Sequence, residues 1–318
     1  MNRSLGAFRA AWLAGWVALS AGGVLYARAK GIPAWAAIPI LAAFLIEYPF
    51  YLVPGFEAVR ERWARWLPWL LVVSFVLPYV MYAANTGQFR WWGLAQLAAL
   101  ATGISLWYIV LPRAPLTDGA FLILIAGVVL GKYLDRIYTS PLAGVPVEIL
   151  GHLALIRACA MVMLIERRVA DTRFGFVPSW REWKIGLRHG IYFLATGIPL
   201  AWAIGLLRLG SIMPFWKIAA TFLGILWVVA LSEEFFFRGL LQQWLTRWTG
   251  NASLGLAGAA ILFGAAHLGF RGFPNWRFML LAAVAGLFYG RAYSQAKSIR
   301  ASLVTHALVV TLWRAAGG

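Results

Sequence analysis

Apolar stretches of about 20 residues recur along the whole chain, and they constrain its fold more than any other feature. A helix that crosses a bilayer needs roughly 20 consecutive apolar residues, and in lipid its backbone polar groups must pair within the segment. Apolar runs of this kind therefore predict helices. Hydrophobic segments lie near residues 10–27, 33–53, 67–84, 91–111, 119–134, 142–165, 188–207, 216–241, 253–270, 277–293 and 300–315.

The composition of the chain supports a membrane location. Hydrophobic residues make up 62% of the sequence and charged residues 12%, whereas soluble domains contain roughly half apolar and a quarter charged residues. We therefore predict an all-α fold, a polytopic transmembrane helix bundle with about 9–11 membrane segments. The number is a range because the segment at 119–134 is short and is expected to be re-entrant or interfacial.

The net charge of +17 indicates a membrane orientation rather than a nucleic-acid partner, because lysine and arginine gather in the cytoplasmic loops of membrane proteins. With the N-terminus inside the cell, sixteen of the 28 basic residues fall on the cytoplasmic side and ten on the other side. We expect an integral protein of the bacterial inner membrane, with a cytoplasmic N-terminus, the lipid bilayer as a partner and no nucleic acid.

The longest polar stretch, residues 166–187, divides the apolar segments into two groups. We predict an N-terminal accessory transmembrane region at 1–165, a basic cytoplasmic linker at 166–187 and a catalytic transmembrane domain at 188–318. The last of these regions contains most of the unusual polar residues inside apolar segments, and it is therefore expected to enclose a polar cavity.

The stretch "LSEEFFFRGLL" places Glu233, Glu234 and Arg238 inside an otherwise apolar helix. A charged side chain at the centre of a membrane helix costs about 2.5–3.5 kcal/mol on insertion scales, so such residues generally serve a function. Glu234 and Arg238 are four residues apart and can pair on one helix face. Glu233 is rotated by about 100° from them and has no partner within the helix. This difference makes Glu233 the candidate general base.

Two of the chain's four histidines follow in later apolar segments, His267 in "ILFGAAHLG" and His306 in "ASLVTHALVV". Two histidines in the helices after an acidic pair indicate a site more strongly than one buried histidine would. Bringing both histidines to Glu233 requires staggered, tilted or broken helices.

Among the other polar residues, Glu47 is expected near an interface or a kink, and Arg157 is expected to find a carboxylate or carbonyl on another helix.

These residues resemble the motifs of the CAAX-protease and bacteriocin-processing family of intramembrane proteases. The EExxxR motif matches Glu233, Glu234 and Arg238, the FxxxH motif matches Phe263 and His267, and the histidine of the third motif matches His306. The third motif continues with a polar residue four positions later, where this chain has Val310. The resemblance covers roughly residues 183–313.

The resemblance implies hydrolysis of a peptide bond within the membrane. By position, Glu233 and His267 would hold and deprotonate the attacking water, Glu234 and Arg238 would form a supporting pair, and His306 would stabilise the oxyanion. Phe263 would support the site or contact the substrate. Thr305 and Thr311 are candidates to compensate for the polar group missing at Val310, although neither has the same spacing.

Two questions stay open at this level, the metal and the function class. A zinc ion would use Glu233, His267 and His306, but the chain lacks HExxH, and a glutamate can act as a base without metal. We therefore expect no cofactor, with zinc as the alternative. The predicted function is an intramembrane endopeptidase acting on a membrane-associated peptide or protein. The alternative is a non-enzymatic membrane protein, either a transporter or a catalytically silent scaffold.

Overall fold

The computed structural model describes residues 2–207, 210 and 213–315 of the chain. Every regular element in these residues is helical, which confirms the predicted all-α fold. The helices that are long and apolar enough to cross a membrane lie at Ser4–Ala29, Ala34–Gly55, Glu57–Thr86, Trp91–Val110 and Phe215–Thr249. Shorter apolar helices lie at Pro115–Leu130, Ile149–Ile165 and Ala252–Ala266. Together these features define a polytopic integral membrane protein.

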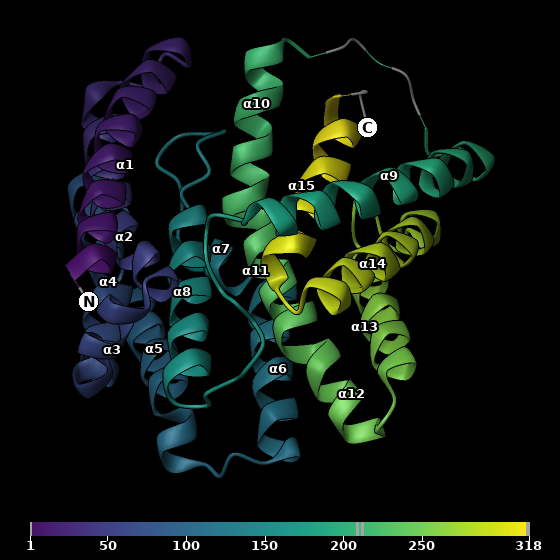
Figure 1. Cartoon of the computed structure of the whole chain (residues 1–318). Helices are drawn as coiled ribbons and strands as arrows, with labels where there is room; N and C mark the ends of the chain where they lie inside the picture. Colours follow the sequence, from purple (N-terminus) through teal and green to yellow (C-terminus); the bar gives the residue numbers. More distant parts are fainter. Residues whose placement is uncertain (1, 208–209, 211–212, 316–318) are drawn as a thin grey trace. The chain divides into compact units, whose positions relative to one another are not determined.

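The chain forms two compact units, Met1–Arg168 and Val169–Gly318. The first unit contains α1 (Asn2–Ala29), α2 (Ala34–Leu52), η1 (Val53–Gly55), α3 (Glu57–Trp63), η2 (Ala64–Trp66), α4 (Leu67–Thr86), α5 (Trp91–Val110), α6 (Pro115–Leu130), α7 (Tyr133–Ile137) and α8 (Ile149–Ile165). Helices α2, α4 and α8 pack against one another in pairs, and α4 and α8 also pack against α5. These contacts form the core of the first unit (Figure 1).

A buried ion pair joins α2, α4 and α8. Arg157 of α8 donates from Nε to Glu47 Oε1 over 2.9 Å and from Nη1 to Ser74 Oγ over 2.7 Å. Glu47 is 0% exposed and lies in α2 two residues before Pro49, and the expected carboxylate partner of Arg157 is confirmed. A charge in an apolar interior is tolerated when it is paired and hydrogen-bonded. Here the Arg157 guanidinium of α8 and the Glu47 carboxylate of α2 neutralise each other.

The second unit begins with α9 (Trp180–Ala203), which starts earlier than the apolar segment predicted at 188–207. The Ser179 side chain accepts a hydrogen bond from the backbone of Glu182, and the Glu182 side chain accepts one from the backbone of Ser179. This reciprocal capping box satisfies backbone groups that the first helical turn would otherwise leave unpaired. Residues 180–187, which the polar composition assigned to the linker, are therefore the first turns of a helix.

One nearly continuous helical rod carries the acidic pair. It consists of α10 (Phe215–Gly224), η3 (Ile225–Val229), α11 (Ala230–Glu234), η4 (Phe235–Gln242) and α12 (Gln243–Thr249), and η3 and η4 wind as π-helix. In Figure 1, α10, α11 and α12 follow one another along a line, and α9 runs across that direction. Two π-helical stretches thus flank Glu233 and Glu234. Local π-helix is rare and occurs frequently at functional sites.

Three further helices complete the second unit, α13 (Ala252–Ala266), α14 (Trp276–Ala296) and α15 (Ile299–Ala315). Helix α14 packs against α9, α13 and α15, and α15 also packs against η3 and α11. The GxxxG spacing of Gly286 and Gly290 allows a close approach of α14 to its neighbours. A Cβ atom at Gly286 would lie 3.1 Å from Ala260 Cα, and one at Gly290 would lie 2.3 Å from Leu256 Cδ1.

The Glu47–Arg157 pair gives a testable prediction about stability. Glu47→Leu should lower the free energy of unfolding by about 3–5 kcal/mol, because it leaves Arg157 buried without its counter-charge. The double variant Glu47→Leu/Arg157→Met should recover most of this loss, since no buried charge remains unpaired. Equilibrium unfolding in detergent measures both values. Equal losses in the single and double variants would show that the ion pair does not determine the effect.

Candidate active site

The predicted pair of Glu234 and Arg238 is present and fully buried. Arg238 Nη1 donates to Glu234 Oε1 over 2.9 Å, and both side chains are 0% exposed. Arg238 Nη2 donates to the carbonyl of Gly286 on α14 over 3.0 Å. The guanidinium therefore joins η4 to α14 at the point where the missing side chain of Gly286 leaves room for it.

Three aromatic rings surround the Arg238 guanidinium. Its carbon lies 4.6 Å from the ring centroid of Phe263, 5.2 Å from that of Tyr289 and 5.8 Å from that of Phe237. Aromatic faces attract cations, most strongly where water is excluded. The rings thus stabilise the charge that the Glu234 carboxylate neutralises. Phe263 supports the site in this way, as an apolar wall and a cation-binding face.

His306 of α15 contacts the same carboxylate. Its Nδ1 lies 2.8 Å from Glu234 Oε1, and the residue is 2% exposed. The imidazole stacks on Tyr289, with centroids 4.6 Å apart and an interplanar angle of 17°, and it meets the Phe263 ring edge-on at 5.9 Å. Glu234 Oε1 therefore accepts hydrogen bonds from two helices, from Arg238 on its own rod and from His306 on α15.

Glu233 lies on the other side of the His306 ring. Its Oε2 is 3.8 Å from His306 Nε2, which is too long for a hydrogen bond. The Glu233 side chain is 29% exposed, yet Oε2 itself is buried and has no hydrogen-bond partner among the described residues. A water oxygen between the two atoms could lie within hydrogen-bond distance of both. The site thus contains an open acceptor beside an imidazole nitrogen.

His267 occupies a different position from His306. It follows the last residue of α13, and its Nδ1 is 2.7 Å from the Phe263 carbonyl oxygen. Its ring lies 4.7 Å from the Phe263 ring and 5.8 Å from the Phe278 ring. Phe263 thus lies against both histidine rings and against Arg238. Of the two histidines, His306 is the one that directly contacts the glutamates.

The side chains near the missing polar group of the third motif have separate roles. Thr305 Oγ1 donates to the carbonyls of Gly186 and Ala301, at 2.9 and 3.2 Å, and so serves the packing of α15 on α9. Thr311 Oγ1 is buried without a hydrogen-bond partner in the described part of the chain. Thr305 is therefore engaged in packing, whereas the hydroxyl of Thr311 is uncommitted.

Among the described residues, no group of three or more His, Cys, Asp or Glu side chains is arranged to hold a metal ion. Nδ1 of His306 is engaged with Glu234, and Nδ1 of His267 with the Phe263 carbonyl. A metal-binding histidine commonly hydrogen-bonds its other ring nitrogen to a carboxylate or a backbone carbonyl, so these contacts do not decide the zinc alternative, with Glu233, His267 and His306 as ligands, and we derive no step through a metal.

Sequence reasoning missed Tyr289, which stacks on His306 and faces Arg238. A tyrosine in an apolar helix is ordinary, so nothing in its own position points to a site. The available signal was its place between Gly286 and Gly290, since a helix face that allows close approach is a place where side chains of other helices converge.

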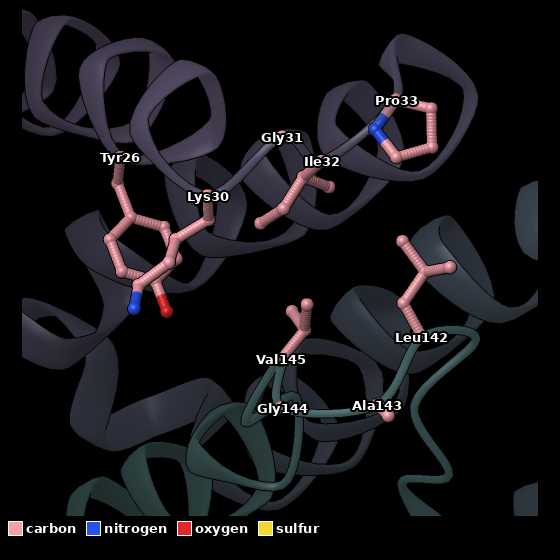
Figure 2. Close-up of a pocket in the computed structure, with 9 residues that line it drawn as sticks. All are labelled: Tyr26, Lys30, Gly31, Ile32, Pro33, Leu142, Ala143, Gly144 and Val145. Carbon is pink, nitrogen blue, oxygen red and sulfur yellow. The ribbon is translucent and has the colours of Figure 1, made fainter.

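A separate pocket of about 230 Å³ lies in the first unit, at the turn between α1 and α2. Figure 2 shows Tyr26 and Lys30 on one side of it and the 142–145 loop on the other. No histidine or carboxylate lines this pocket. It is therefore distinct in its chemistry from the glutamate–histidine site of the second unit.

The fold and these contacts define a helical membrane protein with a buried glutamate, histidine and arginine site. Residues 214–312 match the family model described as type II CAAX prenyl endopeptidase Rce1-like. The match contains every motif residue of the site, and it confirms the resemblance to the CAAX-protease and bacteriocin-processing family for this part of the chain. No curated protein and no solved structure matches the chain.

The helix that carries His306 is anchored at its start by Glu182 of α9. Ser298 Oγ donates to Glu182 Oε1 over 2.5 Å, and Arg300 Nε donates to the same oxygen over 3.0 Å. Burial alone would raise the pKa of Glu182, but the hydrogen bonds from Ser298 and Ser179 and the Arg300 charge together lower it. The contacts therefore favour the ionised carboxylate and fix the first turn of α15 against α9.

This anchor predicts a pH dependence of stability. Because the pKa of Glu182 is lower in the folded state, its contribution is complete above the unfolded pKa and is lost as the pH falls through the folded pKa. Between about pH 5 and pH 3, the melting temperature of the wild type should fall more steeply than that of Glu182→Gln. Thermal unfolding in detergent across this range measures the difference. Parallel curves would contradict the role assigned to Glu182.

Proposed function

We propose that the protein is an intramembrane endopeptidase that hydrolyses a peptide bond of a membrane-associated peptide or protein. The observation that carries this proposal is the unpaired Glu233 carboxylate beside His306 Nε2, 3.8 Å away, next to the buried Glu234–Arg238 pair. The similarity of residues 214–312 to the CAAX prenyl endopeptidase family supports the same reaction class. That similarity does not identify the substrate, and a prenyl group is not part of the proposal.

The proposed reaction uses Glu233 as the general base. A water held at Glu233 Oε2 transfers a proton to the Glu233 carboxylate, and the water oxygen forms a bond to the scissile carbonyl carbon. The carbonyl π electrons move to oxygen, and the tetrahedral intermediate then expels the amine, which takes the proton from Glu233. Water is consumed, the C–N bond breaks, and Glu233 returns to its starting state. Glu234 and Arg238 support the site electrostatically.

The non-enzymatic alternative remains a possible outcome of the test. A transporter that uses intramembrane charges would leave its buried ionisable groups free to change partners. In the first unit, however, Glu47 and Arg157 hydrogen-bond to each other, and Arg157 also reaches Ser74. This closed set of contacts favours a structural role for the first unit.

We further propose that the protein resides in the bacterial inner membrane with its N-terminus in the cytoplasm.

The direct test is cleavage of fluorogenic, membrane-anchored peptides by the purified protein in liposomes. Glu233→Gln should lower kcat by at least about 100-fold with little change in melting temperature, because it removes the base and keeps the shape of the side chain. Glu234→Gln should lower the stability by several kcal/mol, about 3–5, because it leaves Arg238 buried without a counter-charge.

Glu61→Gln serves as a matched control, since Glu61 is an exposed carboxylate of α3. It should cleave at the wild-type rate. Equal losses of activity and equal melting shifts in Glu233→Gln and Glu234→Gln would contradict the division of roles. A wild-type protein that folds and cleaves none of the peptides would favour the catalytically silent alternative.

A second prediction concerns metal. Cleavage by a glutamate-activated water should survive exhaustive chelation, because no catalytic group is removed. A zinc enzyme would lose activity with chelator and regain it with added metal, since the ion lowers the pKa of its bound water. We expect chelator-resistant cleavage and no stoichiometric zinc by elemental analysis. Stoichiometric zinc that disappears together with activity in His267→Ala would overturn the metal-free mechanism.

A further inference from the structure

The pocket of the first unit, with a volume of about 230 Å³, has a lining that suits a ligand of one chemical class. Its walls are the end of α1 with the turn that follows it, and the 142–145 loop (Figure 2). One water occupies roughly 30 Å³ in the liquid, so the pocket has room for a larger group. The position and the charge of the lining determine which group fits.

The pocket lies at the level of the membrane surface. It adjoins the short connection between two helices that are long and apolar enough to cross a bilayer, Ser4–Ala29 and Ala34–Gly55. Such a connection lies in the headgroup region, because both spans end there. Tyr26 in the last turn of α1 and Trp35 in the first turn of α2 are exposed, as is typical of aromatic residues at the interface of lipid and water. Lipid headgroups therefore reach the pocket.

The only charged side chain that lines the pocket is the ammonium group of Lys30. Tyr26 contributes a hydroxyl, and the other lining residues are apolar or glycine. Tyr26 and Lys30 are four residues apart, which places them on one face of the end of α1. Figure 2 shows the polar ends of both side chains pointing away from the helix in the same direction. An ammonium group beside a hydroxyl donor is a suitable pair for a phosphate group.

Backbone turns fix both walls of the pocket. Helix α1 ends in a Schellman motif, in which the amides of Gly31 and Ile32 donate to carbonyls of the last helical turn over 3.2 and 2.9 Å. Opposite, the 142–145 loop is closed by a hydrogen bond of 3.4 Å from its last amide to its first carbonyl, and Gly144 has a φ of 79°. A ligand that enters walls already in place loses less conformational entropy in the protein.

We propose that this pocket binds the phosphate group of an anionic phospholipid, through the Lys30 ammonium and the Tyr26 hydroxyl. The ammonium neutralises the phosphate, and the hydroxyl donates to one of its oxygens. The acyl chains then lie along α1, where Val24 and Leu25 are exposed. This site is independent of the proposed endopeptidase reaction, because every residue that lines it belongs to the first unit.

The lining favours an anionic headgroup over a zwitterionic one. A headgroup with its own ammonium would bring a second cation close to Lys30, and no carboxylate lines the pocket to receive it. Free phosphate has the same oxygens, but it lacks the acyl chains and therefore gains nothing from the burial of apolar surface. The proposed ligand is thus a lipid that carries net negative charge, such as phosphatidylglycerol.

The test measures how fast an amine-reactive reagent labels each lysine of the whole protein in lipid nanodiscs. Discs of phosphatidylcholine are compared with discs that also contain phosphatidylglycerol, and peptide mass spectrometry gives the rates for Lys30 and for Lys132, an exposed lysine of the same unit. Phosphatidylglycerol should slow the labelling of Lys30 about fivefold more than that of Lys132. Equal slowing of both lysines would reflect the surface potential alone and would overturn the proposal.

Two variants separate the pocket from the general surface charge. Tyr26→Phe should reduce the protection of Lys30 about threefold, because it removes one hydrogen-bond donor and keeps the ring. Arg28→Gln is the matched control, since Arg28 is exposed and does not line the pocket, and it is rotated by about 200° from both Tyr26 and Lys30. It should leave the protection unchanged. An equal loss of protection in both variants would contradict the site.

Inorganic phosphate distinguishes the two sources of the phosphate group. Millimolar phosphate added to discs of phosphatidylcholine should leave the labelling of Lys30 unchanged, because the ion lacks acyl chains. Protection by inorganic phosphate as strong as that by phosphatidylglycerol would overturn the assignment to a lipid. The assay involves no cleavage, so its result and the test of the endopeptidase function succeed or fail separately.

Discussion

The rest of the second unit depends on the hydrogen bonds of the Glu234 carboxylate. Its Oε1 accepts hydrogen bonds from Arg238 and from His306. These bonds link helix α15 to the helical rod of which α11 is a part. Arg238 extends the connection to α14 through the Gly286 carbonyl. A buried carboxylate without partners would be costly, and these contacts compensate for its burial while they bring three helices into one arrangement. The aromatic rings around Arg238 exclude water from the pair.

Buried charges occur in both units, and their surroundings separate a structural pair from a candidate site. In the first unit the Glu47 oxygens both contact Arg157, whose Nη1 reaches Ser74, so the polar groups are satisfied within the protein. In the second unit Glu233 Oε2 and Glu234 Oε2 are buried without a hydrogen-bond partner among the described residues. The first unit has open acceptors as well, at both side-chain oxygens of Glu166. In the second unit the open acceptors belong to carboxylates that also lie against His306 and Arg238, and this arrangement supports chemistry there.

The helices could be predicted from the sequence because the requirement is simple, a run of apolar residues long enough to satisfy its own backbone in lipid. The boundary of α9 could not be predicted in the same way. Its first turns are polar, and they are helical because of the capping box of Ser179 and Glu182 and the anchor of Glu182 on Ser298. Hydrophobicity therefore predicts membrane helices better than it predicts their polar ends.

The site was predictable only where its contacts lie within one helix. The pairing of Glu234 with Arg238 follows from a spacing of four residues, which places both side chains on one face. The contact of His306 with Glu234 depends on how α15 packs on the rod, and nothing in the local sequence of either helix specifies it. For the same reason the sequence did not reveal that Tyr289 stacks on His306. The contact of His267 with Phe263, by contrast, follows from their spacing of four residues.

The central claim is that Glu234 and His306 share one hydrogen-bonded site, and a double-mutant cycle tests it most directly. The free energy of unfolding is measured in detergent for the wild type, for Glu234→Gln, for His306→Met and for the double variant. Residues in one hydrogen-bond network typically show coupling energies of about 0.5–3 kcal/mol, and we predict a value in this range. Losses that add to within about 0.3 kcal/mol would show that the two side chains act independently, and would contradict the account.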